Sequence, residues 1–306
     1  MRDSMNYSKP LNVFILAVIA TFLWGCAPSF IKIGYELLNI DATQISNIIL
    51  FAGLRFTLAG ILVIFIQSIL KRKPLIPQKT DIKPIIVLAL FQTFGQYMFY
   101  YLGLSKTTGV NAAIITGTGA LITLLFSVYL FKNEKLTKSK LIGCCIGLLG
   151  IVCMNISNEV NISWGGDGLV LISQICYSLS ACFIHLFSKK HDSVLLSGYQ
   201  FLTGGMALIL VSLCMGASLQ FEGIKIYFVL LYLGIISAVA YTLWGLLLAH
   251  NPVSKIGIYG CLTPIFGVFI SAVLLQEFKQ AISIQSLSAL FFIVLALYLV
   301  NKEKKA

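Results

Sequence analysis

Residues 107–134 have the sequence TTGVNAAIITGTGALITLLFSVYLFKNE, in which a polar turn precedes a long apolar run that ends at Glu134. The same design returns 143 residues later in residues 250–277, HNPVSKIGIYGCLTPIFGVFISAVLLQE. Six aligned pairs are identical: Val110/Val253, Ile115/Ile258, Gly117/Gly260, Ile122/Ile265, Phe126/Phe269 and Glu134/Glu277. Because the spacing is close to half of the 306 residues, the pair indicates an internal repeat.

The composition is that of a membrane protein. Hydrophobic residues make up 58% of the chain and charged residues 11%, whereas soluble domains carry roughly 25% charged residues. Uncharged stretches reach the length of about 20 residues that crosses a hydrocarbon core about 30 Å thick. We therefore expect an all-α, polytopic protein whose surroundings are the lipid bilayer.

Ten apolar segments are separated by short loops that carry turn-forming or charged residues. They span about residues 11–34, 43–69, 82–105, 108–131, 138–157, 165–188, 194–216, 225–249, 253–276 and 281–301. This division predicts ten transmembrane helices in two five-helix repeats, residues 1–157 and 158–306. Because each repeat holds an odd number of helices, the second copy must be inverted relative to the first.

The net charge of +11 is concentrated on one side of the expected membrane. Lysine and arginine cluster in the loops that would share a side with the N-terminus, such as residues 71–83, 132–140 and 302–305. This distribution is the positive-inside signal, so both termini are expected in the cytoplasm and the protein in the cell membrane. It leaves little support for a nucleic-acid partner, and nothing in the sequence indicates a homo-oligomer.

The eight cysteines all lie inside apolar segments and show no metal-ligand spacing. We interpret them as packing residues and predict no metal ion or other cofactor.

Several motifs occur in a recognisable order along the chain. They are FLWGCAPSFIKIG (22–34), GLRFTLAGIL (53–62), YYLGLSKTTGVNAAIITG (100–117), LLFSVYLFKNEKLT (124–137) and LTPIFGVFISAVLLQE (262–277). Together they resemble the EamA-type transporters of the drug/metabolite transporter superfamily. The resemblance implies ten helices, a central cavity lined by the first, third, fourth, sixth, eighth and ninth, and export or exchange of small organic metabolites.

One departure from the family pattern is Leu121, where the first repeat often has proline as the partner of Pro264. We therefore do not expect the two arms to break symmetrically, and we expect the arm that contains Pro264 to flex more. Pro28 and Pro264 are predicted hinges, and Glu134 and Glu277 are predicted to lie at gates.

Polar and aromatic residues inside the apolar segments mark the expected solute pathway, because lipid does not tolerate unpaired polar groups. Gln92, Gln96 and Tyr100 are spaced to share one helical face. The predicted substrate-binding residues are Trp24, Gln92, Gln96, Tyr100, Thr116, Gln174, Tyr177, Tyr241, Trp244, Tyr259 and Thr263. Such a lining suits neutral or amphipathic solutes, and the predicted substrates are amino-acid-like or amphipathic solutes. The alternative is that these residues only bond helices to one another.

Arg55 is the one basic residue near the middle of a segment. An unpaired charge there costs at least about 2.5 kcal/mol. Its partner is either a substrate carboxylate or phosphate, or else helix-terminal carbonyls or a polar neighbour that fix the bundle. No Asp or Glu lies at mid-depth, so coupling is expected to use exchange or His185 rather than a buried carboxylate.

An intramembrane enzyme would need a nucleophile–base set, paired acids or a metal cluster within the span, and the sequence offers none. A scaffold would have no reason to carry polar faces on so many helices. We therefore predict a non-enzymatic secondary transporter that exports or exchanges small organic metabolites by alternating access. The alternative is uptake or exchange of a nucleotide-like or anionic metabolite through Arg55.

Overall fold

The computed structural model describes residues 6–41, 43–107, 109–155, 164–275 and 283–301, and all regular elements in these ranges are helical. Eight helices in the described ranges are long and apolar enough to cross a bilayer. Their side chains place apolar surface both toward neighbouring helices and outward, as expected where lipid replaces water around the protein.

The first half of the chain begins with two long helices, α1 (Pro10–Leu37) and α2 (Ile45–Lys71). A third rod consists of α3 (Lys79–Leu88), the π-helical stretch η1 (Ala89–Gly95) and α4 (Gln96–Leu104). A fourth consists of α5 (Gly109–Gly117), α6 (Gly119–Leu125) and the π-helical stretch η2 (Phe126–Leu130). Helix α7 (Lys138–Asn155) follows.

The second half contains α8 (Trp164–Phe187), α9 (Ser193–Cys214) and α10 (Lys225–His250). The next rod is formed by α11 (Val253–Gly257), the 3₁₀ turn η3 (Ile258–Cys261) and α12 (Leu262–Leu275). Helix α14 (Ile284–Asn301) ends the described chain.

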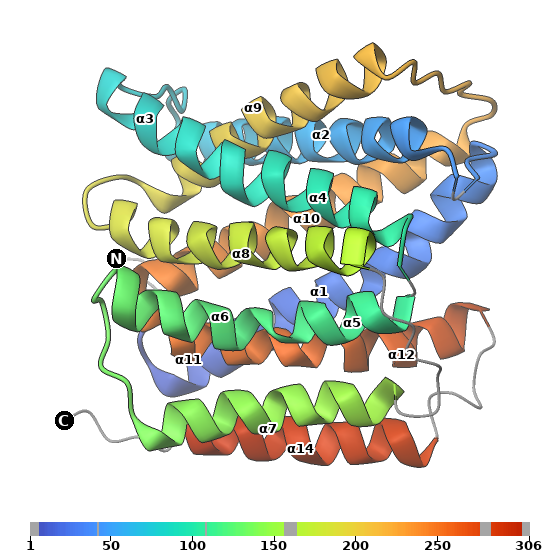
Figure 1. Ribbon diagram of the computed structural model, residues 1–306. Helices are drawn as coiled ribbons and strands as arrows, with labels where there is room; N and C mark the ends of the chain where they lie inside the picture. Colours follow the sequence, from blue (N-terminus) through green and yellow to red (C-terminus); the bar gives the residue numbers. More distant parts are fainter. Residues whose placement is uncertain (1–5, 42, 108, 156–163, 276–282, 302–306) are drawn as a thin grey trace.

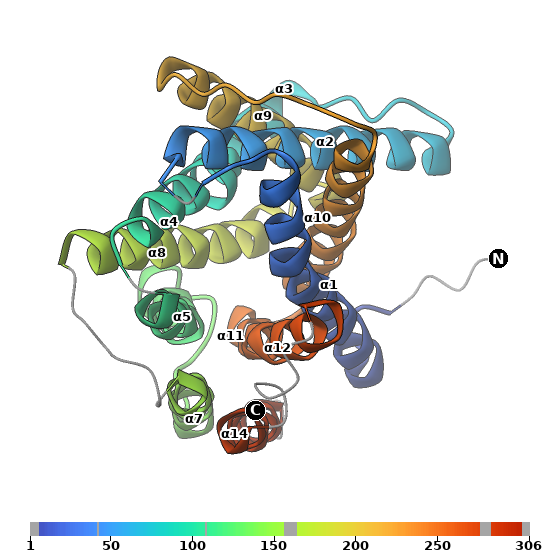
Figure 2. The same ribbon diagram turned by 90° about the vertical axis from the view of Figure 1, so that its right-hand side faces the viewer.

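Helices from the two halves lie side by side. The pair α2 and α9 forms one side of the molecule and the pair α7 and α14 the opposite side, with α1, α4, α8 and α10 between them (Figure 1, Figure 2). Glycines allow the close approach of α2 and α9. A Cβ added at Gly60 would lie 2.5 Å from the backbone nitrogen of Leu202, and one at Gly205 would lie 2.5 Å from that of Thr57. Small residues of this kind let membrane helices pack backbone to backbone.

The start of α1, the end of α10, the start of α7 and the end of α14 meet at one edge, which we call the amino-terminal edge. Asn251 donates to the carbonyl of Tyr7 at 2.8 Å, and Ser139 donates to the carbonyl of Leu299 at 2.6 Å. At the opposite edge, the side chain of Asn111 donates to the carboxylate of Asp167 at the start of α8.

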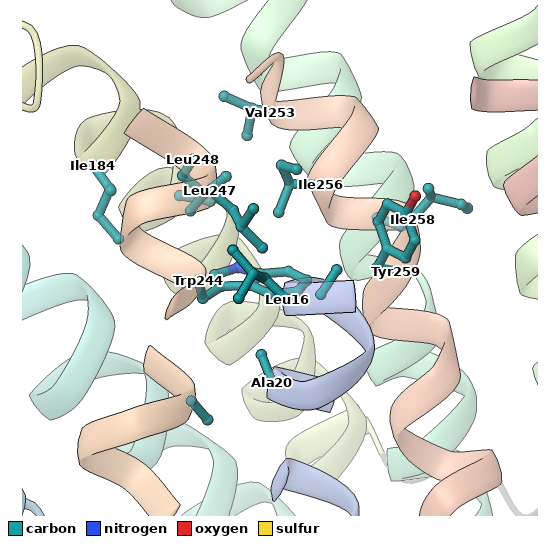
Figure 3. Close-up of a cluster of buried hydrophobic side chains, with 14 of the residues drawn as sticks. Leu16, Ala20, Ile184, Trp244, Leu247, Leu248, Val253, Ile256, Ile258 and Tyr259 are labelled. Atoms are coloured by element: carbon teal, nitrogen blue, oxygen red, sulfur yellow. The ribbon is translucent and has the colours of Figure 1, made fainter. Parts of the chain in front are cut away.

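The largest buried apolar cluster joins α1, α8, α10 and α11 near the amino-terminal edge. Figure 3 shows Trp244 and Leu16 side by side, with Leu247 and Leu248 on the next turn of α10. Trp244 is 1% exposed. This cluster fixes α10 against α1, so that the central section of both helices is held in place.

The rod of α5 and α6 and the rod of α11 and α12 break at equivalent positions, contrary to the expectation drawn from the Leu121/Pro264 mismatch. Thr118 interrupts the first rod, because both its N–H and its hydroxyl bond to the carbonyl of Ile115, at 3.0 and 2.6 Å. The second rod narrows to a 3₁₀ turn at Ile258–Cys261, just before Pro264. With the spacing of 143 residues, Thr118 corresponds to Cys261. A threonine hydroxyl in one rod thus produces a break where the other has a proline, which removes a helical N–H.

Candidate functional site

Aromatic rings from α1, α2, α4, α9 and α10 meet in the middle of the molecule. We call Trp24, Phe56, Tyr97, Phe201 and Tyr241 the central aromatic cluster. Phe56 and Phe201 stack at 5.5 Å between ring centroids and an interplanar angle of 9°. Tyr241 meets Phe201 at 4.9 Å and Trp24 at 4.8 Å, both edge to face. Such arrangements add about 0.5–1.5 kcal/mol for each pair beyond the burial of their area.

Polar groups link the rods of the two halves around this cluster. The hydroxyls of Tyr97 and Tyr241 bond to each other across 144 residues of sequence. Thr93 donates to the side-chain oxygen of Gln200 at 2.6 Å, and Gln200 is fully buried. These groups therefore occupy the interior between the third rod, α9 and α10, where unpaired polar groups are costly.

Arg55 belongs to the same region. It is 4% exposed, and its Nε donates to the hydroxyl of Ser237 on α10 at 3.0 Å. Its guanidinium carbon lies 4.5 Å from the centroid of the Phe56 ring and 6.0 Å from that of Tyr97. The polar neighbour considered from the sequence is thus Ser237, and the guanidinium faces the bundle interior rather than lipid.

The predicted binding residues fall into four groups, the last of which lies on the third rod and is described below. Trp24, Tyr241 and Trp244 lie together, since the two indole rings are 4.8 Å apart. Gln174 and Tyr177 lie on α8 facing the break after α5: a Cβ on Gly119 would come within 2.7 Å of the Gln174 side-chain oxygen.

The third group lies away from the central aromatic cluster. Thr116 and Pro28 are exposed, and Thr263 and Pro264 are half-buried. Tyr259 is buried and its hydroxyl donates to Asn301 at 3.4 Å, near the amino-terminal edge. Glu277 lies outside the described residues.

The face of the third rod that meets the second half is displaced by one residue from the face predicted from a regular helix. Thr93 and Tyr97 make the contacts with α9 and α10, while Gln92 is buried beside them and Gln96 and Tyr100 are half-buried. The stretch η1 explains the difference, because a π-helical turn holds an extra residue and rotates all later side chains.

Phe56, Tyr97 and Phe201 were not predicted from the sequence. A signal for them exists in GLRFTLAG (53–60) and GYQFLTGG (198–205), which align at a spacing of 145 with both glycines and the phenylalanine identical. This repeated motif is short, and only the contact between the two phenylalanines in the structure shows that the aligned segments pack against each other.

Glu134 joins the two halves at the amino-terminal edge. Its carboxylate accepts bonds from the backbone N–H of Ser254 at 3.0 Å and from the Ser254 hydroxyl. Ser127 donates to it at 2.8 Å and the Lys140 ammonium at 2.9 Å. Burial alone would raise the pKa of Glu134, but the bonds from Ser254, Lys140 and Ser127 outweigh it and hold that pKa below its ordinary value.

His185, the coupling candidate, lies near the same edge. Its Nδ1 is 2.7 Å from the carbonyl of Leu248, so that nitrogen carries the proton and donates to the end of α10. Within the described ranges, no group of three or more His, Cys, Asp or Glu side chains comes together as a metal site.

Two hollows on the surface are not part of this site. One of about 620 Å³ is lined by Phe221, Ile224, Tyr227 and neighbours at the start of α10, and one of about 440 Å³ by Met206, Leu210 and neighbours on α9. Both are open, and their lining is mainly apolar in the first and nearly wholly apolar in the second, which is what lipid-facing helices present.

Comparisons with known proteins agree with this architecture. A crystal structure described only as that of a protein matches with a TM-score of 0.79 and 17% identity, over 93% of this chain and 94% of that chain. The chain is 24% identical to an uncharacterized transporter of Archaeoglobus fulgidus, covering 95% of this chain and 98% of the relative. It is 26% identical to an uncharacterized transporter of Synechocystis, covering 95% and 90%.

The model of the EamA-like transporter family matches the chain twice, over residues 11–156 and 164–302. These matches cover almost all of the described helices, and the relatives are themselves described as transporters. The chain is a multi-pass membrane protein that belongs to the EamA-like transporter family.

Proposed function

We propose that this protein is a secondary transporter that exports or exchanges small organic metabolites, with amino-acid-like or amphipathic solutes as the substrate class. The observation that carries the proposal is the central aromatic cluster, where rings and hydroxyls from both halves meet at one point. Aromatic faces accept apolar bodies and cations, and the adjoining polar groups orient a solute.

Unfilled hydrogen-bonding groups next to the cluster support a binding role. The indole N–H of Trp24 and the side-chain oxygen of Gln96 are buried and have no hydrogen-bond partner among the described residues. Leaving a buried polar group unpaired costs about 1–3 kcal/mol. A solute that offers one acceptor and one donor would satisfy both groups.

We also propose the architecture of ten membrane helices in two inverted repeats, residues 1–157 and 158–306, in the cell membrane with both termini in the cytoplasm. Reciprocal contacts between the halves support it. Helix α1 packs on α10 and α12, and α8 packs on α4 and α6, while α2 packs on α9 and α7 on α14. Suppose that α1 corresponds to α8, the third rod to α10 and the fourth rod to α12. The contacts of α1 with α10 and α12 then correspond to those of α8 with the third and fourth rods, and the α2–α9 and α7–α14 contacts each correspond to themselves.

Individual residue pairs show the same reciprocity. At the spacing of 144 residues that separates Tyr97 from Tyr241, Thr93 corresponds to Ser237. At the spacing of 145 that separates Phe56 from Phe201, Arg55 corresponds to Gln200. The bond between Arg55 and Ser237 is therefore the counterpart of the bond between Thr93 and Gln200. A pseudo-two-fold axis through the Phe56/Phe201 stack would relate all four residues.

Such symmetry supports alternating access, because each half could adopt the conformation of the other and expose one site to each side in turn. Glu134 and Ser254 would then close the cytoplasmic mouth. At the spacing of 143 residues their counterparts are Glu277 and Asn111, and Asn111 lies at the opposite edge beside Asp167.

The experiment is a metabolite-wide comparison of uptake and efflux in vesicles that contain the purified protein. We expect at least one small organic solute to cross faster than in protein-free vesicles, and Gln96→Leu and Tyr241→Ala to slow it. If no solute in the panel moved faster than in protein-free vesicles, the proposal would be rejected.

A further inference from the structure

Arg55 is a buried cation whose charge has no ionic partner in the described part of the chain. One of its five N–H groups donates to Ser237, and the others find no acceptor among the described residues. No described carboxylate forms an ion pair with it. A guanidinium remains charged in proteins, so the unmatched donors and charge raise the free energy of this arrangement.

The corresponding position in the second half shows that the fold does not need a charge there. Gln200 occupies the place that matches Arg55, but its side-chain oxygen accepts a hydrogen bond from Thr93, whereas Arg55 donates one to Ser237. Gln200 is fully buried on α9, and its side-chain contact is with Thr93 of the third rod. A neutral amide is therefore sufficient for packing, and the cation on one side of the Phe56/Phe201 stack needs another explanation.

Arg55 adjoins the central aromatic cluster, where Trp24 and Gln200 leave donors and Gln96 an acceptor without a hydrogen-bond partner among the described residues. The Trp24 indole N–H is buried without a partner in the described chain, and the Trp24 ring contacts Tyr241. In the Tyr97/Tyr241 pair one hydroxyl donates to the other, so the second proton is left to donate elsewhere. A surplus of donors beside a cation fits an acceptor-rich anion, and the surrounding rings fit an apolar or planar body.

A single cation favours a single negative charge. Arg55 is the one Lys or Arg that lies away from the ends of the described membrane-length helices. A phosphate dianion would leave one charge unmatched in this interior, whereas a carboxylate can take two parallel N–H bonds from one guanidinium.

We propose that Arg55 binds the carboxylate of the transported solute, so that the substrates are small organic acids, including amino acids, with an apolar or aromatic body. This rests on the proposed transport function. The Tyr97/Tyr241 hydroxyls and Trp24 donate to the same carboxylate or to groups beside it, and the aromatic rings contact the body of the solute.

The test uses matched acids and primary amides: phenylalanine, N-acetylphenylalanine and 3-phenylpropionate, each with its amide. The mixture is loaded into vesicles that contain the full-length protein, and efflux is measured against protein-free vesicles. We expect at least one acid to leave at least about tenfold faster than its amide, because an unpaired buried charge costs several kcal/mol. Amides leaving as fast as their acids would overturn the proposal.

Three variants locate the effect. Arg55→Met is expected to abolish the preference for acids. Ser237→Asp places a carboxylate beside the guanidinium and is expected to compete with the solute, so acid efflux should fall at least about tenfold below that of the neutral, isosteric Ser237→Asn. Gel filtration checks that each variant folds. If Arg55→Met does not fold, the comparison of Ser237→Asp with Ser237→Asn tests whether Arg55 binds the carboxylate. Equal acid efflux in Ser237→Asp and Ser237→Asn would overturn the proposal.

The outcome also separates this proposal from the transport proposal. If other metabolites in the wide panel move and no acid exceeds protein-free vesicles, the role of Arg55 is wrong and transport stands. If nothing moves at all, both proposals fall.

Discussion

Glu134 and Ser254, 120 residues apart, join the two halves of the chain at the amino-terminal edge, where one carboxylate accepts both the backbone N–H and the hydroxyl of the serine. Glu134 ends the arm that contains α5 and α6, and Ser254 begins the equivalent arm of the second half. A contact between the ends of two corresponding arms is where a mouth between two moving halves would close.

Glu134→Gln is expected to weaken this contact. The amide carries no charge for Lys140 and replaces one acceptor oxygen by an NH2 group, so about 1–3 kcal/mol of unfolding free energy should be lost. The measurement is the thermal unfolding midpoint of the protein in detergent. Glu222→Gln, at an exposed residue, removes the same charge and should leave the midpoint unchanged. Equal shifts in both variants would contradict the role of the contact.

The contribution of Glu134 should depend on pH with a defined sign. Because its folded-state pKa lies below the ordinary value of 4.5, the carboxylate stabilises the folded protein fully above that value. The stabilisation is lost as the pH falls through the lowered folded-state pKa. The difference in unfolding midpoint between wild type and Glu134→Gln should therefore stay constant from about pH 7 to 5 and shrink below 4.5. If the difference in unfolding midpoint between wild type and Glu134→Gln grew as the pH fell below 4.5, the lowered pKa of Glu134 would be contradicted.

Gly60→Ala should be strongly destabilising. The added methyl would lie 2.5 Å from the backbone nitrogen of Leu202 and 2.7 Å from the carbonyl of Gly198, and backbone cannot turn aside, so α2 and α9 must separate. We expect a loss of about 1–3 kcal/mol.

Gly168→Ala is the matched control, because a methyl there meets nothing within 4 Å. It should be neutral or should stabilise α8 by about 0.5–1 kcal/mol. Thermal unfolding of both variants in the same detergent gives the comparison. A Gly60→Ala protein as stable as Gly168→Ala would contradict the close packing of α2 on α9.

Tyr241→Phe should weaken solute binding without changing the ring packing. The hydroxyl of Tyr97 then loses its partner, a change of about 1 kcal/mol, so the KM of the transported solute should rise about fivefold. Tyr129→Phe removes a hydroxyl from an exposed ring and serves as the control. The KM is measured from initial rates in vesicles. An equal KM in both variants would contradict a role of the Tyr241 hydroxyl in solute binding.

The sequence predicts the helical membrane architecture well, because long uncharged runs permit few other structures in lipid. It also identifies Arg55, Trp24 and Tyr241, since charged and polar-aromatic residues stand out within apolar segments. Trp24 contacts Tyr241, and Arg55 lies against Phe56 of the same cluster.

The details that the sequence does not predict depend on local backbone geometry. The π-helical stretch η1 brings Tyr97 and Thr93 to the contacts with the second half, although a regular helix places Gln92, Gln96 and Tyr100 on one face. The break at Thr118 depends on a hydroxyl bonded to a carbonyl three residues earlier. Neither feature has a periodic pattern, so a comparison of apolar spacing does not reveal it.

The most direct test of the proposed alternating access is to bridge the Glu134/Ser254 contact at the amino-terminal edge and measure transport. Glu134→Cys and Ser254→Cys are combined in a chain from which the eight native cysteines are removed, and a short bis-methanethiosulfonate reagent bridges the pair. Each single cysteine treated with the same reagent is the control. We predict that bridging the pair stops solute flux in vesicles and that a reducing agent restores it. Flux that continues unchanged with this contact bridged would contradict alternating access between the two halves.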